Sequence, residues 1–262
     1  MTERLDARNA RIERSLERTL SSPHADVEFD SMRDRWPSEY VRGQLFLALV
    51  DAVGTDVSDP FPAAVSLELS YLQALVHGRL LEEISPSGRT AREDDRAILA
   101  GDYLQARAFE RLGRLDAPAP LVARCFSVVT RASIRIHEGQ FEGRQFAGDA
   151  SRETGGVIRF DHTAPAVLGG AAARLAGVLG GLEGETLDRL EGGGAAFGWT
   201  LATEAITGNA AVARPRESLD GIIAGIVDSC QTAAAPGLHR KLRRIATRVC
   251  ENRDPVKPSG RP

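Results

Sequence analysis

Lysine, cysteine and aromatic residues are scarce in this sequence, and each shortage excludes a class of protein. Arginine supplies all but two of the 33 basic side chains, and the formal net charge is -3. A nucleic-acid-binding domain usually carries an excess of basic residues, so binding to DNA or RNA is not expected. The three cysteines, Cys125, Cys230 and Cys250, form no CxxC pair, which argues against a structural zinc site and a disulfide framework.

Long apolar runs are also missing. No stretch reaches the roughly 20 apolar residues that span a bilayer. Residues 1–20 are rich in Arg and Glu and lack the apolar segment of a signal peptide. We therefore expect a cytoplasmic protein. Because aromatic residues make up only 5% of the chain, its core is expected to consist mainly of Leu, Ala, Val and Ile.

The alternation of apolar and polar residues that predicts β-strands is absent as well, and helical periodicity takes its place. The predicted helices span residues 2–20, 39–53, 63–84, 93–112, 119–141, 164–179, 195–206, 218–233 and 238–250. We predict one compact all-α domain over residues 1–251, with an amphipathic helix at 1–20 and a disordered tail at 252–262.

Five landmarks occur in a fixed order along the chain. Residues 97–104 read Ala-Ile-Leu-Ala-Gly-Asp-Tyr-Leu. The other four are residues 64–77, the stretch 138–140, Thr154 with the small-residue run 164–177, and the segment 194–197. This ordered set resembles the trans-isoprenyl diphosphate synthase (polyprenyl synthetase) family. The resemblance implies the all-α fold of that family, the terpenoid synthase type, and a role in isoprenoid biosynthesis.

In active members of that family, two aspartate-rich motifs bind the Mg²⁺ ions that hold an allylic diphosphate. On this chain the six aligned positions are Gly78, Arg79 and Glu82 for the first motif, and Leu201, Ala202 and Ala205 for the second. Only Glu82 keeps a carboxylate, whereas Mg²⁺ requires oxygen ligands. The resemblance therefore implies a degenerate member that has lost its Mg²⁺, binds no other cofactor and is inactive alone as a prenyltransferase.

The remains of the diphosphate pocket are expected to include five residues: Arg42, His77, Arg79, Glu82 and Gln140. Arg42 stands where the family has a basic motif for the second substrate. Arg79 is expected either to form a surface salt bridge or to pair with a diphosphate in place of Mg²⁺, as a guanidinium can. His77 has no second His or Cys near it in the sequence, so we predict no metal site and no catalytic residue.

Two further features leave alternatives open. Gln73 lies where the product tunnel of the family begins, and its polar side chain fits either a tunnel that no longer holds a prenyl chain or a local hydrogen bond. The basic run 239–244 is interpreted as the solvated face of the last helix, in preference to a membrane-binding surface. Its inward face is predicted to carry Leu238, Leu242, Ile245 and Val249.

The resemblance also implies dimerisation through helices equivalent to residues 96–112 and 121–140. Gly101, Ala106 and Ala108 are small enough to permit close helix contact there. We therefore expect a homodimer, or a heterodimer with an active isoprenyl diphosphate synthase. Three hypotheses of function remain: a non-catalytic partner subunit, a protein that binds a prenyl chain or another apolar ligand, and a transferase with a rewired site around Arg79 and Glu82.

Overall fold

The computed structural model describes residues 5–21, 39–82, 91–150, 160–207, 218–230 and 235–251, and every regular element in these ranges is an α-helix. The helices are α1 (Leu5–Leu20), α3 (Val41–Val53), α4 (Phe61–Glu82), α5 (Ala91–Leu112), α6 (Ala119–Ala150), α7 (Phe160–Leu179), α8 (Gly184–Thr207), α9 (Leu219–Cys230) and α10 (Ala235–Glu251). In this part of the chain no helix combines the length and the hydropathy that a membrane span requires. The predicted tail 252–262 lies outside the described residues.

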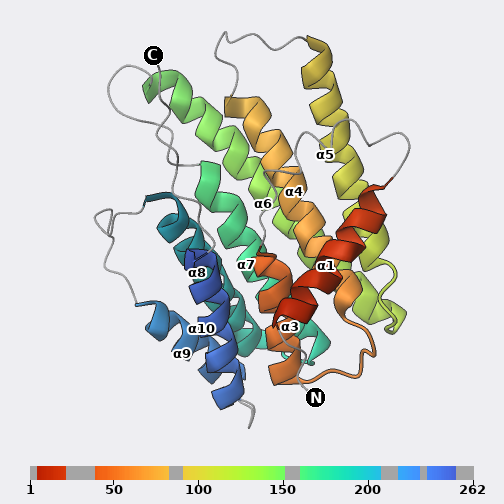
Figure 1. Ribbon diagram of the computed structural model, residues 1–262, viewed down its shortest axis with the longest axis vertical. Helices are drawn as coiled ribbons and strands as arrows, with labels where there is room; N and C mark the ends of the chain where they lie inside the picture. The colour runs from red at the N-terminus through yellow and green to blue at the C-terminus, as the bar shows by residue number, and fades with distance from the viewer. Residues whose placement is uncertain are drawn as a thin grey trace.

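The core lies where α3 contacts α4 and α7 near the middle of the molecule (Figure 1). Almost every side chain of α3 is buried, with Leu45, Phe46 and Leu49 fully inaccessible. A helix that is apolar all round is buried all round, and α1, α8, α9 and α10 complete the packing around it. The buried apolar side chains form one connected cluster, and most of them are aliphatic, as the composition predicted.

Helix α8 begins eleven residues earlier than predicted, at Gly184 rather than Ala195. The helix runs through the glycines at 192–194, although glycine in a helix interior costs about 1 kcal/mol. The close approach of α7 accounts for Gly194 and for Gly198 one turn further on. A Cβ on Gly194 would lie 2.5 Å from the carbonyl oxygen of Gly169 in α7, and one on Gly198 would lie 2.2 Å from that of Pro165. The two backbones can meet only because these positions carry no side chain.

Helices α1 and α10 cover the core from outside, and α1 crosses in front of α3 and α4 in Figure 1. Ion pairs hold both in place. Asp51 of α3 accepts a hydrogen bond from Arg8 of α1 at 2.7 Å and another from Lys241 of α10. Arg248 of α10 pairs with Asp6 of α1. The two terminal helices are thereby linked to α3 and to each other.

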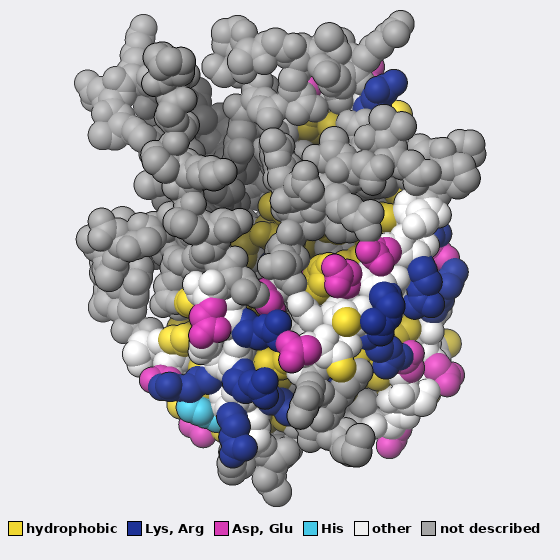
Figure 2. Space-filling model, in the orientation of Figure 1, with side chains coloured by type: hydrophobic (Ala, Val, Ile, Leu, Met, Phe, Trp, Pro, Cys, Tyr) yellow, Lys and Arg dark blue, Asp and Glu magenta, His cyan; other side chains and the backbone are white. Residues whose placement is uncertain are grey.

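The inward and outward faces of α10 follow the sequence prediction. Leu238, Leu242 and Ile245 are buried, and Val249 packs partly buried against the core. In the basic run, Lys241 pairs with Asp51 and Arg243 with Asp220 of α9. Figure 2 shows Lys and Arg side chains interspersed with Asp and Glu on this face of the molecule. Such a mixed surface is typical of a solvated helix face, in agreement with the prediction.

The small residues of α5 have a different role from the predicted one. A Cβ on Gly101 would lie 2.0 Å from Nε2 of His77, so this glycine allows α4 and α5 of the same chain to pack together. Ala108 is fully buried within the chain, and only Ala106 is exposed. The prediction that Gly101 and Ala108 lie at a subunit interface is therefore wrong, because contacts inside the chain already cover them.

Candidate functional site

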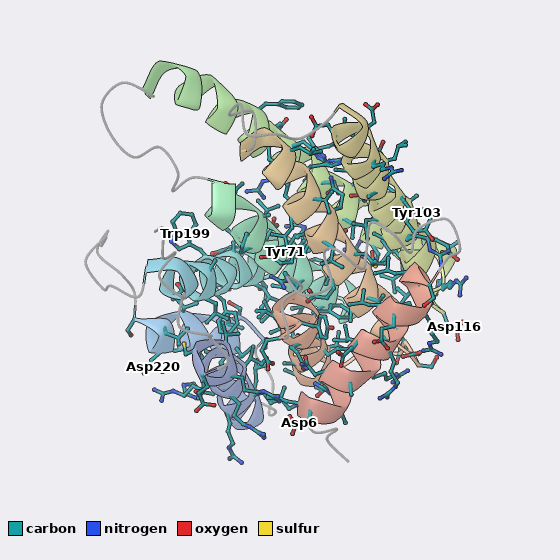
Figure 3. All side chains as sticks on the ribbon, turned by 45° about the horizontal axis from the view of Figure 1, so that its top comes forward. Asp6, Tyr71, Tyr103, Asp116, Trp199 and Asp220 are labelled. Atoms are coloured by element: carbon teal, nitrogen blue, oxygen red, sulfur yellow. The ribbon has the colours of Figure 1, made fainter. Side chains whose placement is uncertain are left out.

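Arg42 forms a buried ion pair. Its guanidinium donates to Oε2 of Glu68 on α4, from Nη2 at 3.1 Å and from Nε at 3.2 Å. Its charged group also lies 3.6 Å from the ring centre of Tyr71, which Figure 3 places near the centre of the molecule. Burial, the largest single influence, lowers the pKa of Arg42, but the charges and hydrogen bonds of Glu68 and Tyr71 together outweigh it and hold this pKa above its usual value.

Glu68 has a second role at the start of α3. Tyr40, the N-cap residue, forms no capping hydrogen bond through its side chain. The Oε1 atom of Glu68 instead accepts the backbone N–H of Gly43 at 2.7 Å. The first N–H groups of a helix lack partners within the helix, and a carboxylate stabilises them. The carboxylate of Glu68 therefore occupies the place around Arg42 and Gly43 that a bound anion would need.

Gln140 is also committed to contacts inside the protein. It is buried on α6, and its Nε2 donates to the backbone oxygen of Ala74 at 3.2 Å. Two other residues of the expected pocket, Arg79 and Glu82, belong to the last turn of α4. Their backbone is described, whereas their side chains lie outside the described part of the structure. The salt bridge proposed for Arg79 therefore stays a prediction.

His77 and Gln73 meet a residue that sequence reasoning missed. The Nε2 atom of Gln73 lies 2.8 Å from Nδ1 of His77 and 3.1 Å from Nε2 of His137 on α6. The two imidazole rings meet edge to face, with centroids 5.9 Å apart. Gln73 therefore makes a local hydrogen bond, which was one of its two predicted roles. His77 does have a second histidine beside it, although 60 positions separate the two in the sequence.

One signal in the sequence could have identified His137. It precedes Gln140 by three positions, and residues three apart share one face of a helix. With Gln140 expected in the pocket, its position on the same helix face would have placed His137 there too. The resemblance that led to Gln140 carried no role for His137, and so it was overlooked.

Comparisons with known proteins identify the fold. No family model matches the chain. The chain is 27% identical over 155 residues to a geranylgeranyl diphosphate synthase of Methanosarcina mazei, and the match covers 57% of this chain and 48% of that protein. It is 32% identical over 146 residues to a geranylgeranyl pyrophosphate synthase of Geoglobus acetivorans, which covers 50% of this chain and 46% of that protein. The chain thus matches about half the length of these curated relatives.

The solved structures align over nearly the whole chain. An FPP/GFPP synthase from Zymomonas mobilis superposes with a TM-score of 0.66 at 18% identity, covering 92% of this chain and 97% of that one. The Geoglobus acetivorans synthetase gives a TM-score of 0.63 at 22% identity, covering 96% and 92%. The chain is a distant homologue of the isoprenyl diphosphate synthases. Its all-α fold is theirs, in a single domain.

The positions that the family resemblance aligns with the aspartate-rich motifs lie at the ends of α4 and α8. Gly78 has no side chain, and Leu201 on α8 is buried with an apolar one. Ala202 is half-buried, and the side chains of α8 after Ala202 are not described. None of the described side chains at these positions provides an oxygen atom.

Mg²⁺ is the metal that the isoprenyl synthase fold implies, and the described residues do not fit it. Mg²⁺ takes oxygen ligands in a nearly octahedral arrangement. The part of the chain that the structure describes contains no group of three or more His, Cys, Asp or Glu side chains that could hold a metal ion. The described side chains close to the first motif include two imidazoles, the amides of Gln73 and Gln140 and the single carboxylate of Asp102, which do not form the carboxylate cluster that this ion prefers.

Proposed function

We propose that this isoprenyl diphosphate synthase homologue is a non-catalytic subunit that binds an active synthase and changes its activity or product length. The observation that carries the proposal is the absence of oxygen donors at Gly78, Leu201 and Ala202, where α4 and α8 carry the aligned motifs. Bound metal ions contribute several kcal/mol or more to stabilising the charge of a departing phosphate oxygen. A site without them leaves that charge uncompensated.

An arginine side chain that could bind a diphosphate in place of the metal also supports the proposal, because it is already paired. Arg42 is the described arginine in the expected pocket, and Glu68 already neutralises it. A diphosphate would have to displace a buried carboxylate, and it would leave that carboxylate without a partner. Truncating one member of a buried ion pair is strongly unfavourable. Arg42 is therefore assigned here to the stability of the α3–α4 contact.

The exposed surface of α5 and α6 supports the proposal that the chain binds a partner protein. Four large apolar side chains are exposed on these two helices: Ile98, Leu99, Ile134 and Phe141. Leu99 is 67% exposed and Ile134 is 52% exposed. Exposed apolar side chains of this size are enriched in protein interfaces when they form a patch. The family resemblance assigns subunit contacts to the same helices.

A related structure provides a precedent for unlike subunits. A mint geranyl pyrophosphate synthase, described as heterotetrameric, superposes on this chain with a TM-score of 0.63 at 20% identity, covering 92% and 99% of the two chains. By analogy, the partner of this chain is an active isoprenyl diphosphate synthase from the same cell. The place of the pair in metabolism is the synthesis of isoprenoid chains.

The test has two arms. The purified chain is assayed with isopentenyl diphosphate, an allylic diphosphate and Mg²⁺, and no product above background is expected. It is then mixed with the synthase of the same cell, and we expect the two to co-purify and the product length or rate to change. Turnover by the pure chain, or a synthase that neither binds nor responds, would overturn the proposal.

A matched pair of variants tests the binding surface. Leu99→Glu with Ile134→Glu places charges on the exposed faces of α5 and α6 and is expected to abolish co-purification. Trp199→Glu is the control, because Trp199 is 48% exposed on α8, away from those helices (Figure 3). Binding lost equally in both variants would locate the interface elsewhere. Circular dichroism verifies that each variant is folded.

A further inference from the structure

We propose that the C-terminal ends of α1 and α5 form a binding site for a doubly charged phosphate group, which four arginines hold: Arg18, Arg107, Arg111 and Arg114. The two helix ends meet on the right of the molecule in Figure 1, and Figure 2 shows Lys and Arg side chains gathered over α1 on that side. The site does not depend on the proposed role as a partner subunit. It also lies apart from the aligned aspartate-rich motifs, which are at the ends of α4 and α8.

The first observation is that two arginines of this cluster share one carboxylate. Nη1 of Arg107 donates to Oε2 of Glu110 at 2.6 Å, and Nη2 of Arg114 donates to Oε1 of the same residue. Nε and Nη2 of Arg107 both donate to the backbone oxygen of Thr19 in the last turn of α1, at 3.2 and 2.9 Å. Arg107 therefore links the two helix ends and holds the cluster in place.

The second observation is that Arg111 lies among these charges without a counter-ion. Its Nε atom is buried and has no hydrogen-bond partner in the part of the chain that the structure describes. The residue as a whole is half-buried, so its terminal nitrogens still reach solvent. Burial is the largest cause that lowers the pKa of Arg111 below its usual value, and the charge of Arg114 follows. Arg107 and Arg18 act in the same direction, whereas the carboxylate of Glu110 opposes them.

The charge of the cluster determines the charge of the ligand. Its four guanidinium groups and the carboxylate of Glu110 give a formal charge of +3. Arg18 and Arg111 lie in the last turns of α1 and α5, and each C-terminal helix end is equivalent to about −0.5 charge, which leaves about +2. A phosphate group carries about −1.5 to −2 near neutral pH. One phosphate therefore balances the cluster, and a single carboxylate would neutralise only half of the excess.

The guanidinium group suits phosphate by geometry as well as by charge. Arginine presents parallel N–H groups that bind two oxygens of one phosphate. Arg18 is exposed, and the side chain of Arg114 is 57% exposed, so both can close on a ligand that arrives from solvent. Arg107 stays fixed meanwhile by its hydrogen bonds to Thr19.

Isothermal titration calorimetry of the full-length chain with inorganic phosphate tests the proposal. The ionic strength is held constant, because salt screens exposed charges. We expect one phosphate per chain. Arg111→Gln and Arg18→Gln are each expected to weaken binding about tenfold, the factor that one charge-assisted hydrogen bond provides. Arg240→Gln is the matched control, since Arg240 is an exposed arginine on α10, and it is expected to bind phosphate as the original chain does.

Glu110→Gln gives a prediction of the opposite sign. It removes the carboxylate that Arg107 and Arg114 share and raises the charge of the cluster by one. Phosphate binding is expected to become about fivefold tighter, the effect of one unit charge a few ångströms away in water. If the arginines served only to pack the helix ends, loss of Glu110 would loosen them and weaken binding. Circular dichroism verifies that each variant is folded.

Vesicles of phosphatidylcholine with phosphatidic acid identify the source of the phosphate. Co-sedimentation of the original chain, lost in Arg111→Gln, would assign the phosphate to a lipid headgroup. Binding of inorganic phosphate without co-sedimentation would assign it to a soluble phosphate compound. Both results support the site.

Three results would overturn the inference. The first is the absence of phosphate binding to the original chain. The second is an equal loss in Arg240→Gln, which would show a general attraction to positive charge. The third is binding that Arg42→Met abolishes and Arg111→Gln leaves unchanged. Because a variant can fail to fold, nuclear magnetic resonance of arginine side chains in the original chain gives an independent readout. Phosphate is expected to shift the Nε signals of Arg111 and Arg18, and shifts confined to Arg240 would contradict the site.

Discussion

Replacing Glu68 by glutamine removes one charge from the buried ion pair with little change in shape. The side chains of Arg42 and Glu68 are 7% and 2% exposed, so the remaining guanidinium cannot turn to solvent. Removing one partner of a buried pair typically costs about 3–5 kcal/mol. We expect Glu68→Gln to lower the free energy of unfolding by about 3 kcal/mol, near the lower end of that range, because the amide oxygen can still accept the N–H of Gly43.

The double variant Arg42→Met with Glu68→Met separates charge from packing. It leaves no buried charge, and apolar replacement of a buried pair is often close to neutral. Two contributions are still lost: the cap on α3, about 1 kcal/mol, and the contact of Arg42 with Tyr71, about 0.5–2 kcal/mol. We therefore expect the double variant to lose about 1–3 kcal/mol, less than the sum of the two single variants.

Urea unfolding followed by circular dichroism measures the original chain, Glu68→Gln, the single variants Arg42→Met and Glu68→Met, and the double variant. The result that would refute the reasoning is additivity, in which the double variant loses as much as the two single variants together. Inorganic pyrophosphate provides a second check. If it raises the unfolding midpoint of the original chain but not of Arg42→Met, then Arg42 is accessible to anions, and its assignment to the fold is incorrect.

Four further predictions concern close contacts and thiols. Gly198→Ala places a Cβ 2.2 Å from the carbonyl oxygen of Pro165 and is expected to lower the free energy of unfolding by about 3 kcal/mol, measured in urea. Gly225→Ala is the control: its Cβ would meet no atom within 4 Å, and it is expected to raise the free energy of unfolding by about 0.5–1 kcal/mol. Gly101→Ala is expected to lose about 1–3 kcal/mol in thermal unfolding and to recover part of it in a His77→Ala background. Burial raises the pKa of Cys125 to about 11, so a thiol reagent near neutral pH is expected to modify exposed Cys250 first. The unfolded thiol ionises at lower pH than the folded one, and stability is therefore expected to fall as the pH rises from 9 towards 11, less steeply in Cys125→Ala.

The helices were largely predictable because their signal is local. In α1 the residues spaced for one face, Leu5, Ile12, Leu16 and Leu20, are all buried. The break after α7 follows from its glycines, since Gly181 and Gly184 adopt positive φ angles of 73° and 55°. The extension of α8 through residues 192–194 was not predictable, because the contact with the backbone of α7 that requires a glycine at 194 is a tertiary contact.

In the candidate site, too, some features were predictable from the sequence and others were not. The sequence by itself determined which residues have no donor atoms, since Gly78, Leu201 and Ala202 cannot provide an oxygen from any side-chain conformation. Only the tertiary structure decided that Arg42 pairs with Glu68, and that His137 reaches His77 through Gln73. Periodicity fixes which face of a helix is buried. The partner that this face contacts depends on how the helices cross, and residues 26 or 60 positions apart carry no local signal of that geometry.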